Sequence, residues 1–159
     1  MMPAPSMPEP SRPNQLHQLL ESDVFDASRP DDGAREPAFV RVIQLLNDLL
    51  RQSAAAGHRI DFTKEVGVHG KIQDVTSLVA SLRQSLVAEP GGAAHYAPQQ
   101  FNCYYGAGTG YFANGAFFDA DYADDVAFFV GDQRIYLNRH IRRATQEAEG
   151  YVAESQPPF

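Results

Sequence analysis

The residues best suited to chemistry are four aspartates in one short stretch, Asp119, Asp121, Asp124 and Asp125. Closely spaced carboxylates are the ligands of an EF-hand, whose loop needs Gly at its sixth position and Glu at its twelfth. Counted from Asp119, those positions hold Asp124 and Val130. The sequence therefore lacks an EF-hand. A loose Ca²⁺ or Mg²⁺ site is the alternative, and the pattern favours a solvated acidic loop that binds a basic partner.

Two other groups of candidate residues fit structural roles better. The stretch GAGTG at 106–110 lacks the Gly-Lys-Ser/Thr of a Walker loop. Tyr111 enters a strand where a dinucleotide fingerprint needs a glycine that enters a helix, so we expect a bend in a strand. Cys103 and His140 offer a nucleophile and a base. However, Cys103 lies in a strand-like alternation rather than at the start of a helix, which predicts an inert buried thiol.

A further set of residues resembles part of an enzyme family. His69, followed by Gly, and the stretch YGAGTGYFA at 105–113 resemble two elements of ADP-ribosyltransferases of the poly(ADP-ribose) polymerase type, His-Gly and Gly-x-Gly-x-Tyr-Phe-Ala. The resemblance implies NAD as cofactor, with His69 at its adenosine side and Tyr122 or Tyr111 stacked on the nicotinamide. Glu147 would take the place of the family's catalytic Glu, although it lies in a helical pattern rather than at the start of a strand.

The composition restricts the classes of partner. A net charge of −7 argues against nucleic-acid binding, in which basic residues supply most of the affinity. A single cysteine excludes an intramolecular disulfide. No apolar run approaches the roughly 18–20 residues that cross a bilayer, and the N-terminus lacks the pattern of a Sec signal peptide. These features predict a cytoplasmic protein with no nucleic-acid or membrane partner.

The chain divides into a tail and one domain. Residues 1–13 contain five prolines and no periodic apolar set, so we expect a disordered Pro-rich tail. An unstructured export signal of a secreted effector is the alternative for this tail. Residues 14–159 are expected to form a single α+β domain, because a chain of this length can bury a sizeable core.

Apolar periodicity predicts helices before and after a central sheet. A short helical stripe lies in 14–25, and the clearest one covers 39–50 at spacings of three and four. Asp74 is expected to cap a further helix. The last helix is expected to be capped by Asn138 and to end at Gly150.

Residues 101–137 are predicted to form a largely antiparallel β-meander of four or five strands, packed with the N-terminal helices and the C-terminal helix. Asn114 and Gly115 predict a hairpin with a type I′ turn, which needs φ > 0 at both central residues. A second hairpin turn is expected at 131–133. The strand at 126–130 is apolar on both faces, which predicts a central strand covered on both sides.

The leading hypothesis is a small acidic, non-enzymatic protein-binding module of the immunity, chaperone or adaptor kind found in bacterial secretion and toxin systems. It needs no cofactor, and its partner is a protein with a basic surface. The acidic loop and the aromatic hairpins would form the contact, because Tyr and Phe are enriched in interface cores. The expected contact residues are Tyr111, Asp119, Asp121, Tyr122, Asp124 and Asp125. The alternative is an ADP-ribosyltransferase-like enzyme or secreted effector that uses NAD, with a candidate set of His69, Tyr111, Tyr122 and Glu147.

Overall fold

The structure, a computed structural model, describes residues 12–28, 33–86 and 101–155. Within these ranges the chain has the predicted α+β fold. The helices are α1 (Arg12–Glu21), α2 (Arg35–Ala55), α3 (Val75–Leu86) and α4 (Arg143–Ser155), with a short 3-10 helix η1 (Asp23–Phe25) and a π-helix η2 (Leu137–Arg142). Helix α1 begins inside the predicted tail, and the rest of that tail lies outside the described residues.

The strands of the described residues are antiparallel and belong to two sheets. They are β1 (Phe101–Tyr105), β2 (Gly108–Tyr111), β3 (Phe117–Ala120), β4 (Val126–Val130) and β5 (Gln133–Tyr136). One sheet has the order β1-β4-β5, and the other is the hairpin β2–β3. Because β1 pairs with β4, with Tyr105 opposite Val126, the hairpin is an insertion between two adjacent strands.

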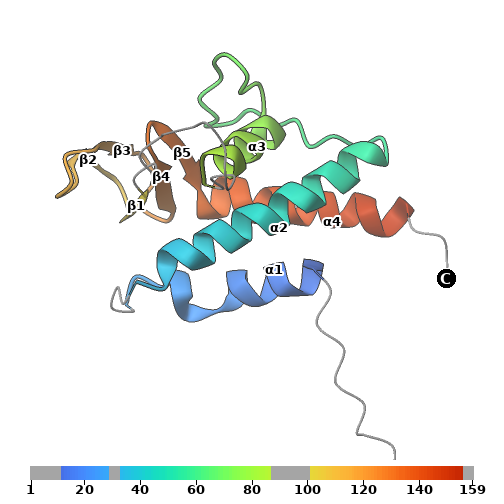
Figure 1. Cartoon of the computed structure of the whole chain (residues 1–159), viewed down its shortest axis with the longest axis horizontal. Helices are drawn as coiled ribbons and strands as arrows, with labels where there is room; N and C mark the ends of the chain where they lie inside the picture. Colours follow the sequence, from blue (N-terminus) through green and yellow to red (C-terminus); the bar gives the residue numbers. More distant parts are fainter. Residues whose placement is uncertain (1–11, 29–32, 87–100, 156–159) are drawn as a thin grey trace, which may run out of the picture.

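Strand β4 lies at the centre of its sheet and is buried on both faces, as its sequence predicts. Val126, Phe128 and Val130 belong to the main core with the helices. Ala127 and Phe129 belong to a second apolar cluster, in which the inner face of the β2–β3 hairpin covers the opposite face of the sheet. Figure 1 shows the helices gathered together, with the strands at one end of the bundle.

Helix α2 is the centre of the helical layer. It packs against α1, α3 and α4, and its apolar stripe reaches the sheet, where the rings of Phe39 and Phe128 lie 4.7 Å apart between centroids. The predicted cap of α3 is confirmed, because the backbone N–H of Ser77 donates to Oδ1 of Asp74 over 2.9 Å. Both carboxylate oxygens of Asp74 also accept from Arg59, at 2.8 and 3.0 Å, which ties the chain before α3 to its first turn.

The two hairpin turns differ in type from one another. Gly115 has φ of +89°, but Asn114 does not have a positive φ, so the predicted type I′ turn is wrong. The backbone N–H of Phe112 donates to the carbonyl of Ala116 over 2.8 Å, which makes a three-residue loop with glycine in the left-handed position. The β4–β5 turn has two residues and φ of +60° at Gly131, its first position, as in a type II′ turn.

The last helix departs from the prediction at both ends. Asn138 lies inside η2 and does not cap it; instead its backbone N–H donates to the carboxylate of Asp125 over 2.8 Å. Gly150 lies within α4 and does not end it. The ring of Tyr151 stacks on His58 at 4.3 Å between centroids, so the turn that follows the glycine packs against the end of α2.

Replacing Gly108 by Ala is expected to lower the free energy of unfolding by about 1–3 kcal/mol. A Cβ at this position would lie 2.9 Å from Cζ of Tyr104, whose ring stacks on Phe118 at 4.3 Å between centroids. The ring must therefore move, and the cluster between the hairpin and the sheet loosens. Urea denaturation measures the loss. Gly150→Ala is the matched control: it meets no atom within 4 Å and is expected to stabilise α4 slightly.

Candidate functional site

The outer face of the β2–β3 hairpin carries the large exposed aromatic side chains of the described residues. Side chains alternate across a strand, so Phe118 and Ala120 face the sheet while Tyr111 and Phe117 point outward. Tyr111 is 74% exposed and Phe117 is 55% exposed, and their rings meet edge to face at 5.5 Å between centroids. Two adjacent exposed aromatic rings form a surface suited to contact with another molecule.

A groove of about 690 Å³ is lined by Phe117, one ring of this pair. Its walls are the loop before α3, one face of α3, strand β3 of the hairpin and the β4–β5 turn. The lining is mostly apolar. The lining includes Val68, His69, Ile72, Leu78, Phe117, Asp119, Phe129, Asp132 and Arg134.

The first half of the predicted acidic loop lies beside this groove. Asp119 and Asp121 are exposed, and the Asp119 carboxylate accepts from the Thr109 hydroxyl over 3.1 Å. The guanidinium of Arg134 donates to the main-chain carbonyl of Asp119 over 2.6 Å and lies 3.9 Å from the Asp121 carboxylate. It also lies over the ring of Tyr136, 4.9 Å from its centroid. One arginine thus connects the hairpin to the sheet, and both carboxylates remain at the surface.

The second half of the loop has a structural role at its last residue. The side chain of Asp125 has no exposed area, so the expectation that the whole loop is exposed is wrong for this residue. Its carboxylate accepts the backbone N–H groups of Val126, Asn138 and Arg139 at 2.8, 2.8 and 3.1 Å. Arg139 also donates to it through its guanidinium over 3.1 Å. Asp125 therefore caps the π-helix η2 from a distant part of the chain.

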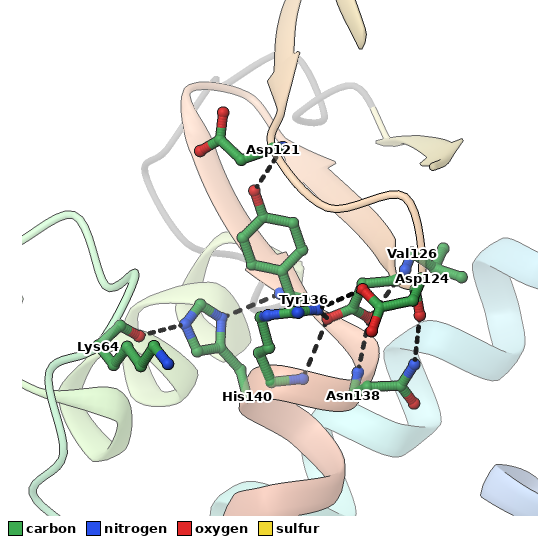
Figure 2. A network of polar contacts seen from close by, with 9 residues as sticks. Lys64, Asp121, Asp124, Val126, Tyr136, Asn138 and His140 are labelled. Carbon is green, nitrogen blue, oxygen red and sulfur yellow. Dashed lines mark hydrogen bonds and ion pairs between the residues drawn. The ribbon is translucent and has the colours of Figure 1, made fainter. Parts of the chain in front are cut away.

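Asp124 lies outside this buried network, at the surface. Its side chain is 76% exposed and its carboxylate pairs with the Arg139 guanidinium at 3.0 Å. That hydrogen bond, outweighing a small effect of burial, lowers the pKa of Asp124. Figure 2 shows Asp124 next to Asn138, whose side-chain amide donates to the Asp124 carbonyl over 3.1 Å. Asp124 thus stays available at the surface, although a cation of the same chain already contacts it.

Tyr122 is held by its neighbours rather than presented to a ligand. The Arg139 guanidinium lies over its ring, 3.4 Å from the centroid. A hydrogen bond to the Glu65 carboxylate raises the pKa of the Tyr122 hydroxyl. Glu65 itself has φ of +61°, a left-handed conformation that is strained for a residue with a side chain. One face of the Tyr122 ring is therefore covered, and its hydroxyl is engaged.

His140 is fully buried and bonded at both ring nitrogens (Figure 2). Its Nδ1 accepts the backbone N–H of Tyr136 over 2.9 Å, which places the proton on Nε2. Nε2 then donates to the carbonyl of Lys64 over 3.0 Å. Burial lowers the pKa of His140, so the ring is neutral in the folded protein. Because both nitrogens are used by the backbone, His140 is not a base for Cys103, which is partly buried in β1 beside the core.

The residues of the NAD hypothesis are only partly brought together. His69 is exposed, and its Nδ1 donates to the carbonyl of Gly67 over 3.0 Å. It lines the groove with Phe117. Glu147 lies on α4, where it pairs with Arg143 at 2.8 Å. It is not part of the groove lining. The bend at Gly106, with φ of +93°, borders a separate depression of about 400 Å³ beside Asp125.

Several residues of the surface were not singled out from the sequence. Phe117 is the main one. The two-residue turn predicted at 114–115 would place Phe118 opposite Tyr111, whereas the observed three-residue loop places Phe117 there. Val68, Phe129 and Arg134 come from three other segments of the chain. No local pattern connects those segments, so only the tertiary structure brings them to one groove.

The described residues do not contain a recognisable metal centre or membrane segment. In ranges 12–28, 33–86 and 101–155, no three His, Cys, Asp or Glu side chains are grouped so that they could hold a metal ion. Nor do those ranges contain a helix with the length and apolar character required to span a bilayer. Comparison with protein-family models, curated proteins and solved structures finds no significant match.

Proposed function

We propose that the protein is a small acidic, non-enzymatic binding module of the immunity, chaperone or adaptor kind, which captures another protein through the outer face of its β2–β3 hairpin. The observation that carries this proposal is the pair of exposed rings, Tyr111 and Phe117, on a hairpin whose inner face is fixed to the sheet. Aromatic anchors on a rigid element lose little entropy on binding and are typical hot spots.

The charge of the same face favours a basic partner. Asp119 lies on the face of the two rings, and Asp121 follows it in the loop. Opposite charges across an interface raise the association rate and fix the relative orientation of the partners. A bacterial origin and a cytoplasmic location belong to this proposal, since secretion and toxin systems use such modules there.

Tyr111→Ser combined with Phe117→Ser is expected to reduce partner capture by more than about tenfold, because aromatic hot spots cost about 2 kcal/mol or more each when truncated. The measurement is a tagged pull-down from a lysate of the source cells at low and high salt, quantified by mass spectrometry. The captured partner is expected to be basic and its yield to fall at high salt.

Tyr151→Ser is the matched aromatic control, because this residue belongs to α4 and its ring stacks on His58 rather than on the hairpin. It is expected to leave capture unchanged. Circular dichroism and urea denaturation check that both variants fold, and exposed positions such as Tyr111 are expected to change stability little. Equal capture by the double variant and the native protein would contradict the proposal.

The second candidate is ADP-ribosyl transfer with NAD, favoured by one observation: His69 lines a groove whose volume is in the range of small-molecule sites. Tyr111 is exposed but is not part of the groove lining. The ring of Tyr122 is covered by Arg139, and Glu147 lies on α4. His69→Ala separates the two candidates. If the enzyme hypothesis holds, the native protein turns over NAD and His69→Ala does not. If the binding module holds, neither protein turns over NAD.

A further inference from the structure

The outer edge of β3 presents backbone groups to the groove. The bond from Phe112 N–H to the Ala116 carbonyl makes these two residues a hydrogen-bonded pair. Pairs alternate along an antiparallel ladder, so Phe117 and Asp119 belong to non-hydrogen-bonded pairs. Their N–H and C=O groups therefore point away from β2. The bond from Arg134 to the Asp119 carbonyl, at 2.6 Å, confirms this direction.

Most of this edge has no partner within the described part of the chain. The Asp119 carbonyl is occupied by Arg134, and farther along the Asp121 N–H donates to the Tyr136 hydroxyl over 3.2 Å. Among the described residues, no hydrogen bond reaches the N–H or C=O of Phe117 or the N–H of Asp119. An exposed strand edge of this kind is a template for a further strand.

The space beside the edge suits an extended chain with alternating side chains. Phe129, Ile72 and Leu78 provide an apolar wall, and Phe117 and Val68 lie exposed at its rim. One face of an added strand would therefore place apolar side chains against Phe129. Such a wall would favour apolar residues at every second position of an added strand.

The charges at the rim of the groove favour basic side chains on the other face of the added strand. Asp119 and Asp132 are exposed acids of the groove lining. The cation of that lining, Arg134, is already bound to the Asp119 carbonyl, to Asp121 and to the ring of Tyr136. The two carboxylates and the adjacent aromatic rings together attract Lys or Arg side chains.

We propose that the groove binds an extended basic peptide segment of the partner protein, which adds as a strand to the outer edge of β3. The peptide alternates apolar residues, which face Phe129, with Lys or Arg, which face Asp119 and Asp132. This inference rests on the proposed binding function and names the kind of segment that the partner contributes. The backbone bonds involve the Phe117 N–H and C=O and the Asp119 N–H.

The test begins with a displayed library of random nonapeptides selected on the full-length protein. The enriched peptides are expected to alternate apolar and basic residues. The best of them is then synthesised in two forms, N-methylated at alternate residues in one register or the other. One form is expected to lose at least about tenfold in affinity, because a strand offers its N–H groups to one neighbour in only one register. Amide shifts in ¹⁵N spectra of the protein are expected at Phe117, Asp119 and Asp132.

The role of the two groove carboxylates is tested with Asp119→Asn combined with Asp132→Asn. This variant is expected to bind the selected peptide at least about tenfold more weakly and with a smaller salt dependence. Glu21→Gln combined with Asp61→Asn is the matched control, since it removes the same charge from exposed positions outside the groove lining. Circular dichroism verifies the fold of both variants.

Several outcomes would overturn the inference. These are enriched peptides without basic residues, indifference to N-methylation in both registers, and no enrichment at all. Amide shifts at the groove caused by NAD but not by the selected peptide, or a dimer that blocks the groove at the concentrations used, would also overturn it. Its failure is distinguishable from that of the proposed function. Partner capture that depends on Tyr111 without any peptide binding overturns only the inference. Peptide binding with partner capture that is insensitive to Tyr111 and Phe117 overturns only the hairpin-face function.

Discussion

Asp125→Asn is expected to lower the free energy of unfolding by at least about 1–3 kcal/mol, the cost of leaving a buried hydrogen-bonding group without its partner. The native carboxylate accepts three backbone N–H groups and the Arg139 guanidinium, and its side chain is inaccessible to solvent. An asparagine keeps the shape but removes the charge, and its amide N–H groups face other donors. Urea denaturation followed by circular dichroism measures the loss.

Asp124→Asn is the matched control for this substitution, one residue earlier in the chain. Asp124 contacts the same arginine from the surface, so its loss is expected to change stability far less. If the two variants are equally stable, Asp125 does not cap η2 in solution. The difference between Asp124 and Asp125 also matters when a binding surface is mapped by mutation. A charge reversal at Asp125 would unfold the protein and imitate the loss of a contact.

His140→Phe is expected to destabilise the protein by about 1–3 kcal/mol for each buried backbone group that it leaves without a partner. Phenylalanine keeps a ring between Phe62 and Tyr136, but it cannot accept the Tyr136 N–H or donate to the Lys64 carbonyl. The same substitution removes the titrating group, so the pH dependence of stability must change with it. Urea denaturation at several pH values measures both effects.

The sign of that pH dependence follows from the lowered pKa of His140. Burial lowers this pKa below 6.5, while the nearby Asp125, Glu65 and Arg134 charges add smaller effects of both signs. Between its folded and unfolded pKa values, the unfolded chain binds more protons than the folded one. The stability that neutral, buried His140 contributes is therefore complete above pH 6.5. It is lost progressively as the pH falls from 6.5 to the folded pKa, by at most about 1.4 kcal/mol per pH unit.

The difference between native and His140→Phe curves isolates this group. Burial acts to raise the pKa of Asp74, but hydrogen bonds from Arg59 and Ser77 outweigh it and hold this pKa below 3.8, so this carboxyl titrates below the window. A native curve as flat as that of the variant between pH 5 and 7 would show that His140 is accessible to water in the folded state.

The fold class was readable from the sequence because it depends on local periodicity. The apolar residues of 126–130 on both strand faces correctly indicate a central, doubly covered strand, and the spacing in 39–50 correctly indicates the main helix. Asp74 was also identified as a cap, because its partner, the N–H of Ser77, lies three residues away. Each of these signals lies within a few neighbouring residues of the chain.

The candidate site was less predictable because its decisive interactions are distant in sequence. The N–H groups that Asp125 caps belong to residues 13 and 14 positions later, and nothing local separates it from the three other aspartates. Likewise, the local signal at Asn138 suggested a helix cap, but a carboxylate from another loop already fills that role. The groove depends on how the hairpin packs over β4. The residue types at 106–110 do not predict that arrangement.

The side chains of the β2–β3 hairpin alternate between the sheet and the solvent, which makes the hairpin suitable for engineering new binding surfaces. Gly108, Gly110, Phe118 and Ala120 are constrained by the sheet that they cover, whereas their neighbours at 109, 111, 117 and 119 are exposed. A combinatorial library confined to those four exposed positions can therefore be screened for new targets without redesigning the scaffold.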